Sequence, residues 1–96
     1  MLVIITYDVS TETPQGQKRL RQVAKICKNF GQRVQKSVFE CLLDPLQLAN
    51  IRSKLQVTIN QEEDSLRIYH LGSNWRPRIE HMGINRPYDP EGPLIR

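Results

Sequence analysis

Cysteine is scarce in this sequence, and so are aromatic residues, which make up 6% of the 96-residue chain. Cys27 and Cys41 form no CxxC pair, which argues against a paired-cysteine zinc site and against a disulfide framework. Both lie within apolar patterns, so we expect buried, reduced thiols. The sequence also has no HExxH motif and no glycine-rich phosphate loop, so two familiar kinds of site are absent.

A long hydrophobic run is missing as well. The strand-like run at the start of the chain, Leu2–Tyr7, is far too short to span a bilayer, and it has neither a basic flank nor a cleavage site. We therefore expect a cytoplasmic protein. A single domain of this size buries only about 60% of the surface of its unfolded chain, so a partner subunit would add to a thin core.

Acidic residues are unevenly distributed, and none occurs between Thr13 and Phe39. The formal net charge is +4, a modest basic balance that favours phosphate-rich partners without identifying one. The acid-free stretch contains a predicted helix with basic residues along one face. Such a stripe either follows a phosphate backbone or is an ordinary solvated face. The stripe consists of Lys18, Arg21, Lys25 and Lys28, with Arg19 beside it and Arg33 just after the helix.

Hydrophobic periodicity predicts a strand, a helix, two strands, a second helix and a further strand. Asp44 followed by Pro45 is typical of a helix start. The predicted segments are a strand at Leu2–Tyr7, a helix at Gln15–Phe30, a strand-like stretch at Arg33–Leu43 with a break near Lys36–Ser37, a helix from Pro45 to about Asn60, a strand at Asp64–Leu71 and a short fifth strand at Arg78–Met82.

This order is typical of the ferredoxin-like βαββαβ fold, an α+β fold in which both helices cover one face of an antiparallel sheet. We expect such a domain over residues 1–83, followed by an extended proline-rich tail over residues 84–96. The first strand is apolar on both faces, so its second face needs another cover. A second protomer packed sheet to sheet is the simplest cover, and we therefore expect a homodimer.

Asp8 follows the first strand directly and is the strongest candidate for chemistry. A carboxylate held at a strand end is a hard oxygen ligand of the kind that Mg²⁺ or Mn²⁺ prefers. One aspartate makes a poor metal site, but a two-fold axis between paired sheets would supply a second Asp8. The alternative is a structural aspartate that caps the turn over Ser10–Thr13. The pattern alone leaves both hypotheses open.

Other candidates have weaker patterns. His70 and His81 are of the residue type used in acid–base catalysis, but neither has a Cys, Ser or Asp partner at useful spacing, so we interpret both as structural or surface residues. Trp75 either stacks on a base or belongs to an interface or the core. Glu40 lies in an apolar strand, where we expect an ion pair with an arginine such as Arg33 or Arg67.

Three stretches together resemble one family. The runs LVIITYDVS, KRLRQVAKICKNFGQRVQKSVFEC and DSLRIYHLG are similar to segments of CRISPR-associated protein two, a small ferredoxin-like metal-dependent nuclease of spacer acquisition. The resemblance covers roughly residues 1–83, and it is strongest to the subgroup that accompanies type I-C loci. It implies a homodimer with facing sheets, in which Arg78–Met82 joins the partner's sheet. It also implies that Asp8 is the metal ligand and that two symmetric copies share one Mg²⁺.

The resemblance further implies metal-dependent hydrolysis of phosphodiester bonds in double-stranded DNA or single-stranded RNA, with basic side chains holding the backbone. Two alternatives stay open. One is a non-catalytic dimer that bridges CRISPR integrase dimers during spacer insertion, and the other is an mRNA-cutting toxin of the same fold. Besides Asp8, the resemblance implies a catalytic role for Tyr7 and functional roles for Arg19, Arg21, Arg33 and Phe39.

Overall fold

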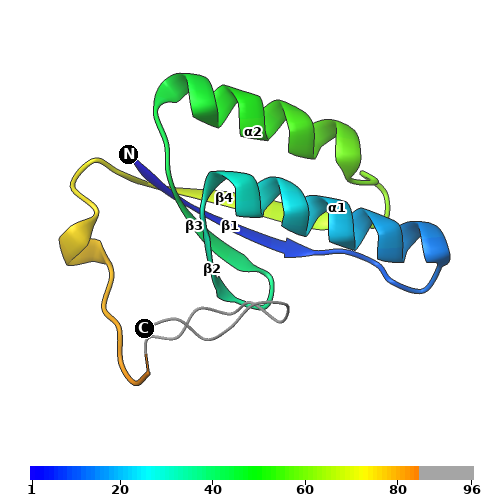
Figure 1. The fold of residues 1–96 in the computed structure, drawn as a ribbon, viewed down its shortest axis with the longest axis horizontal. Coiled ribbons are helices and arrows are strands. Elements are labelled where there is room, and N and C mark those ends of the chain that lie inside the picture. The colour runs from blue at the N-terminus through cyan, green and yellow to red at the C-terminus, as the bar shows by residue number, and fades with distance from the viewer. Residues whose placement is uncertain (85–96) are drawn as a thin grey trace.

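The computed structural model describes residues 1–84, which form a four-stranded antiparallel sheet with two helices on one side of it (Figure 1). This is a small α+β fold, as the sequence predicts, and the elements follow one another in the predicted order. They are β1 (Leu2–Asp8), α1 (Pro14–Phe30), β2 (Gln32–Gln35), β3 (Val38–Leu42), α2 (Pro45–Thr58) and β4 (Ser65–Gly72), followed by the short 3₁₀ helix η1 (Arg76–Arg78).

The strands lie in the order β2-β3-β1-β4, so β1 is central and both of its neighbours run antiparallel to it. Pairing of β1 with β3 ends at Thr6 and Val38, whereas pairing with β4 continues to Asp8 and Ser65. The break predicted near Lys36–Ser37 is confirmed as the turn between β2 and β3. Beyond Thr6, β1 makes one more hydrogen bond on the β3 side, from the Tyr7 N–H to the Ser37 carbonyl, and Asp8 is paired with β4 alone.

Both helices begin where the sequence places a capping residue before a proline. At the start of α1 the Thr13 hydroxyl accepts the Gly16 N–H at 3.0 Å. At the start of α2, Asp44 and Gln47 form a reciprocal capping box with N–O distances of 2.7 and 3.0 Å. The second helix ends at Thr58, slightly before its predicted end. Neither helix in residues 1–84 is long and apolar enough to cross a bilayer.

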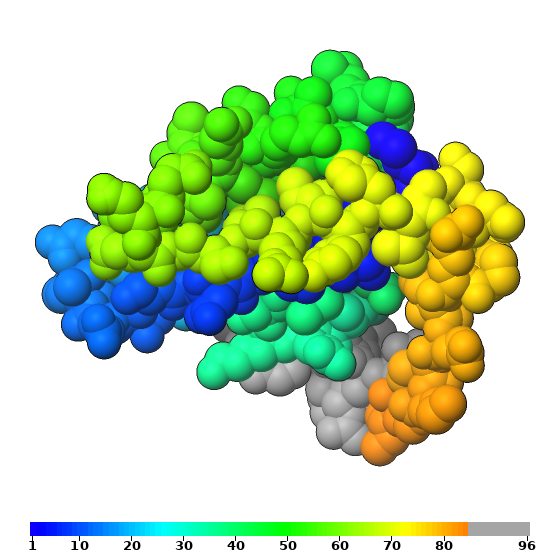
Figure 2. All heavy atoms as spheres, turned by 180° about the vertical axis from the view of Figure 1, so that it is seen from behind, coloured from blue at the N-terminus to red at the C-terminus, as the bar shows by residue number. Residues whose placement is uncertain are grey.

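The core lies between the sheet and the two helices. Alternate residues of β1 and β3 point toward the helices, and Ile5 and Phe39 are completely buried there. The opposite face carries no helix among the described residues, and β4, β1 and the β2–β3 hairpin lie across the middle of the view in Figure 2. Leu42 and Tyr69 are 59% and 46% exposed. The partly apolar second face that the first strand predicts is therefore present.

The two cysteines are buried free thiols, as predicted. Burial raises the pKa of Cys27 to about 12 and that of Cys41 to about 11, so both stay protonated near neutral pH. A Cβ atom at Gly31 would come within 2.4 Å of the Cys41 sulfur, so only glycine allows β2 to begin this close to β3. The thiols thus serve the core and not a reactive site.

The fifth strand predicted at Arg78–Met82 does not form within the single chain. Arg78 closes η1, and residues 79–84 pair with no strand of the described chain. Ile79 has extended dihedral angles, but a strand also needs an edge to pair with. Gly72, with φ +79°, turns the chain away at the end of β4. Residues 85–96 of the predicted tail lie outside the described residues.

One carboxylate joins three parts of the chain beside the end of β1. Asp64 Oδ1 accepts the backbone N–H of Ser10 at 3.1 Å, and its Oδ2 accepts the backbone N–H of Asn60 at 2.8 Å. Arg19 of α1 donates to both oxygens, from Nε at 2.8 Å and from Nη2 at 3.3 Å. Burial alone would raise the pKa of Asp64, but these hydrogen bonds outweigh burial and lower the pKa from its ordinary 3.8.

We expect Asp64→Asn to lower the free energy of unfolding by about 1–3 kcal/mol at neutral pH, because a charged hydrogen-bond acceptor is lost. Since folding lowers the pKa of Asp64, its contribution is complete above pH 3.8 and fades as the pH falls below that value. Urea denaturation of wild type and variant across this range measures the difference, which should shrink in acid.

The matched control for this experiment is Glu63→Gln. Glu63 is the adjacent carboxylate, but its side chain is 47% exposed and lies 3.9 Å from the Arg19 guanidinium, so its loss should change stability little. A destabilisation by Asp64→Asn that does not vary with pH would contradict the role assigned to the Asp64 charge.

Candidate functional site

Asp8 is the last residue of β1 and is exposed. It pairs with Ser65 of β4, just beyond the point where the Tyr7 N–H donates to the Ser37 carbonyl at 3.2 Å. Within residues 1–84 the Asp8 carboxylate does not cap the following turn, because the Ser10 N–H goes to Asp64 instead. The carboxylate therefore stands on a fixed backbone and faces solvent, which favours the ligand hypothesis over the turn-cap hypothesis.

A shallow depression of about 310 Å³ lies beside Asp8, where the end of β1 meets β4. Its oxygen atoms include the Asp8 carboxylate and side-chain hydroxyls of β1 and β4, which are suitable ligands for a hard divalent cation. Within residues 1–84 no three His, Cys, Asp or Glu side chains gather to hold a metal ion, so one chain offers only part of a site. The lining residues are Thr6, Tyr7, Asp8, Ser65, Arg67 and Tyr69.

The Tyr7 and Phe39 side chains lie on the helix-covered face of the sheet, in the core. Their rings stack with centroids 6.3 Å apart, and the Arg33 guanidinium lies 5.1 Å from the Phe39 centroid. The Tyr7 hydroxyl is buried close to Arg33. Burial raises the pKa of Tyr7, and nearby Arg33 lowers it in part. The catalytic role of Tyr7 stays a prediction, and its placement on the face opposite Asp8 favours a positioning role.

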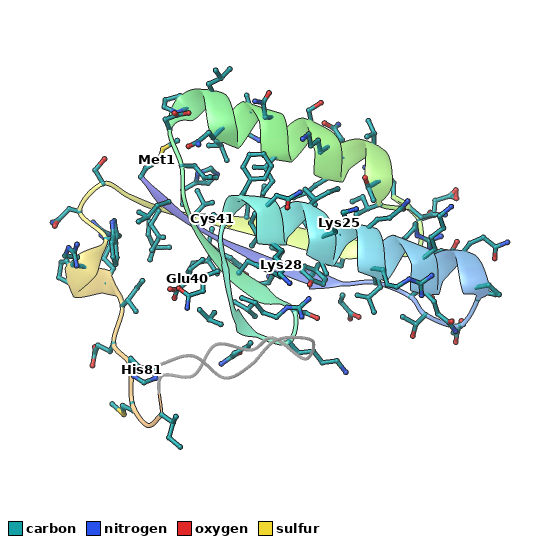
Figure 3. The ribbon with its side chains drawn as sticks, viewed as in Figure 1. Met1, Lys25, Lys28, Glu40, Cys41 and His81 are labelled. Atoms are coloured by element: carbon teal, nitrogen blue, oxygen red, sulfur yellow. The ribbon has the colours of Figure 1, made fainter. Side chains whose placement is uncertain are left out.

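The basic stripe on α1 is exposed along its whole length, as predicted. Figure 3 shows two of its members, Lys25 and Lys28, on the second half of the helix. Among the ion pairs formed within residues 1–84, none includes Lys18, Arg21 or Lys25. From Lys18 to Lys28 the stripe occupies an arc of about 80° and a length of about 15 Å, given helical geometry. That length equals roughly four phosphate steps of one DNA strand.

Arg19 differs from its neighbours on α1. Its guanidinium binds Asp64 at 2.8 Å and lies 3.9 Å from Glu63, and the Arg19 side chain is only 15% exposed. The hydrogen bond to Asp64 raises the pKa of Arg19 further. The guanidinium is therefore directed into the protein, and the structure gives no support to the expected role of Arg19 in nucleic-acid binding.

The weaker candidates stay apart from this site. Glu40 forms no ion pair with any described residue, so the predicted pairing with an arginine is wrong. His81 Nε2 lies 3.2 Å from a backbone carbonyl, and Figure 3 shows His81 on the segment after η1, away from the end of β1. Trp75 is half-buried beneath the Arg76 guanidinium, which lies 4.8 Å from its ring centroid. None of these side chains lines the depression around Asp8.

Sequence reasoning missed three residues near Asp8. Arg67 and Tyr69 line the depression, and Arg67 Nη1 donates to the Tyr69 hydroxyl at 3.2 Å. Alternate residues of β4 share one face of the sheet, so Arg67 and Tyr69 could have been predicted to lie near Asp8 once Asp8 had been assigned to that face. The third residue, Asp64, has no local signal because its partner Arg19 is 45 positions away.

Comparison with known proteins identifies the family. A family model for CRISPR associated protein Cas2 matches residues 1–79. A CRISPR-associated endoribonuclease Cas2 from Nitratidesulfovibrio vulgaris is 57% identical, over 99% of this chain and 93% of its own. A CRISPR-associated endonuclease Cas2 from Halalkalibacterium halodurans is 55% identical, over 99% of both chains. The crystal structure of Streptococcus pyogenes Cas2 at pH 6.5 matches with a TM-score of 0.75 and 53% identity, over 86% of this chain and 100% of that one. The chain therefore belongs to the Cas2 family of CRISPR-associated proteins.

Proposed function

We propose that this protein is a Mg²⁺-dependent endonuclease of CRISPR spacer acquisition, which acts in the cytoplasm as a homodimer on double-stranded DNA or single-stranded RNA. The observation that carries the proposal is Asp8, a carboxylate exposed at a fixed strand end on the uncovered face of the sheet. The names of the relatives, endoribonuclease and endonuclease, support hydrolysis of phosphodiester bonds. Mn²⁺ suits the same oxygen ligands.

A ferredoxin-like homodimer would supply what one chain lacks. Leu42 and Tyr69 make the uncovered face partly apolar, so burial against a second copy is favourable. A two-fold interface brings the same patch of both chains together, so Asp8 near the axis contributes two carboxylates. The segment after η1 would then add to the sheet of the partner. The sequence resemblance alone supports our placement of the chain in the type I-C subgroup.

The residues around the depression fit a shared cation. Two Asp8 carboxylates would hold it, with the hydroxyls of Thr6 and Ser65 nearby. When bound, Mg²⁺ supplies a polarised water and neutralises phosphate charge. The basic stripe of α1 holds the nucleic-acid backbone through contacts that do not depend on sequence. Tyr7, anchored in the core by its contact with Phe39, fixes the backbone that carries Asp8.

A scaffold that bridges CRISPR integrase subunits is the second candidate function, and the layout of the chain favours it in one respect. The basic stripe belongs to the helix layer (Figure 1), whereas Asp8 lies at the end of β1 in the sheet, beside Ser65 and Arg67 of β4. Contact between a DNA duplex and the basic stripe of α1 therefore does not by itself bring the duplex to Asp8. The family assignment gives no support to the third hypothesis, an mRNA-cutting toxin.

We expect Asp8→Asn to reduce Mg²⁺-dependent cleavage of duplex DNA and of single-stranded RNA by about 100-fold or more. Loss of residues that merely support a metal ligand already costs about 10–100-fold, and the ligand itself should matter more. Cleavage of end-labelled substrates with purified dimer measures the effect. Glu62→Gln, which neutralises an exposed carboxylate elsewhere, is the control and should cleave like the wild type.

Two outcomes discriminate between the functions. Unchanged cleavage by Asp8→Asn would rule out the nuclease proposal. Loss of cleavage together with normal spacer acquisition in cells would show that the scaffold is the physiological function and that the Asp8 site is not needed for it.

We expect the double variant Arg21→Gln/Lys25→Gln to weaken binding of duplex DNA and to reduce the slope of log affinity against log salt by about 1–2 units, since each lost phosphate contact removes about 0.9. Fluorescence anisotropy at several salt concentrations measures the slope. Arg52→Gln/Lys54→Gln removes two exposed charges from α2 and is the matched control. If both double variants shift the slope equally, the stripe on α1 is not the binding surface.

A further inference from the structure

The loop between β1 and α1 begins directly after Asp8. One residue of this loop is held by Asp64, which precedes β4, and by Gly16 of α1. The held residue is Ser10, two positions after Asp8. Its N–H donates to Asp64 Oδ1 at 3.1 Å, and Gly16 of α1 lies directly against its carbonyl. Arg19 completes the arrangement by binding the same carboxylate. We refer to Ser10, Gly16, Arg19 and Asp64 as the loop clamp.

The loop clamp fixes Asp8 from both directions along the chain. Before the loop, Asp8 pairs with Ser65, which is the residue that follows Asp64. After Asp8, the Ser10 N–H returns to the Asp64 carboxylate itself. The adjacent residues Asp64 and Ser65 thus hold the backbone at Asp8 and again at Ser10, where pairing of β1 with β3 has already ended.

The first turn of α1 presses on the same loop. A Cβ atom at Gly16 would come 2.0 Å from the Ser10 carbonyl oxygen, a distance that no side chain tolerates. The absence of a side chain at this buried helical position therefore allows α1 to sit against the loop. Glycine weakens a helix interior, and here the close approach to Ser10 explains its presence.

Arg19 holds in place the Asp64 carboxylate, which accepts the hydrogen bond from the Ser10 N–H. The Asp64 side chain has no exposed surface, and a buried carboxylate needs a compensating charge. The guanidinium supplies that charge and fixes both carboxylate oxygens, at 2.8 and 3.3 Å. Without Arg19, Asp64 would turn toward water and release the Ser10 N–H.

From this geometry we infer that Arg19 and Asp64 are positioning residues for Asp8, which set its affinity for a divalent cation through the backbone of the β1–α1 loop. The inference rests on the proposed metal site at Asp8. It assigns Arg19 a different task from the lysines and arginine of the stripe, because it acts through Asp64 and not on nucleic acid. A site shared by two chains is sensitive to such positioning, since each chain contributes one carboxylate.

The test measures Mn²⁺ binding by the wild-type dimer and its variants, using the electron paramagnetic resonance signal of free Mn²⁺, with no nucleic acid present. We expect Asp64→Asn and Arg19→Gln each to weaken Mn²⁺ binding by about 10–100-fold, the usual effect of losing a group that orients a ligand. The double variant should be no weaker than the weaker single variant, because both act through one contact. Glu63→Gln is the matched control and should bind as the wild type does.

Circular dichroism and gel filtration verify that each variant is folded and dimeric. If Asp64→Asn does not fold, Arg19→Lys decides, since lysine keeps the charge but cannot bind both carboxylate oxygens, and it should give an intermediate loss. Wild-type Mn²⁺ affinity in folded Asp64→Asn or Arg19→Lys overturns the inference. Loss of binding by Asp8→Asn in the same experiment would leave the proposed metal site standing, whereas unchanged binding by Asp8→Asn would overturn both.

A second readout separates positioning from direct contact with nucleic acid. Arg19→Gln should leave the salt dependence of DNA binding unchanged, because its guanidinium is occupied by Asp64. A reduction of the slope by about 0.9, the value for one lost phosphate contact, would show instead that Arg19 binds the backbone directly.

Discussion

The buried Asp64 carboxylate is the contact on which the arrangement of the candidate site depends. It accepts hydrogen bonds from the loop after β1, from the turn after α2 and from a side chain of α1. Such a buried charge is costly unless every oxygen is satisfied, so the three elements are restricted to positions that satisfy it. Because the loop after β1 is one of these three elements, the end of β1 and the Asp8 that it carries are restricted in position as well.

The alternation of a β-strand separates the chemistry of this small domain into two layers. Tyr7 points into the core and stacks on Phe39, while its neighbour Asp8 points to the uncovered face. The basic residues of α1 belong to the helix side. A protein of this size thus keeps its carboxylate and its cationic stripe apart, which leaves each surface available for a different partner.

Much of the fold follows from local signals in the sequence. The apolar run of β1, the helical spacing in α1 and the Asp44–Pro45 start of α2 each specify an element without reference to the rest of the chain. The strand order and the uncovered face follow from the order of those elements. Asp8 could be singled out by its place at a strand end, but whether it caps a turn could not, because the answer depends on where Asp64 lies in space.

The same limit explains the errors. Arg19 carries the same charge as the stripe and lies within the same turns of helix, so only its distant partner distinguishes it. The fifth strand cannot be decided from Arg78–Met82 because strand propensity does not specify a pairing partner. In the described chain, residues 79–84 line a pocket with the edge strand β2 but do not pair with it. The place of β1 between two neighbours has a dynamic consequence as well. Backbone amides of a strand flanked by strands on both sides open least often to solvent, and the last hydrogen bond of β1 on its β3 side is the one from the Tyr7 N–H to the Ser37 carbonyl. Asp8 thus lies where the slowest-exchanging backbone of the sheet gives way to faster-exchanging backbone. The paired part of β1 before it keeps Asp8 rigid, and the loop after it gives Asp8 access to solvent.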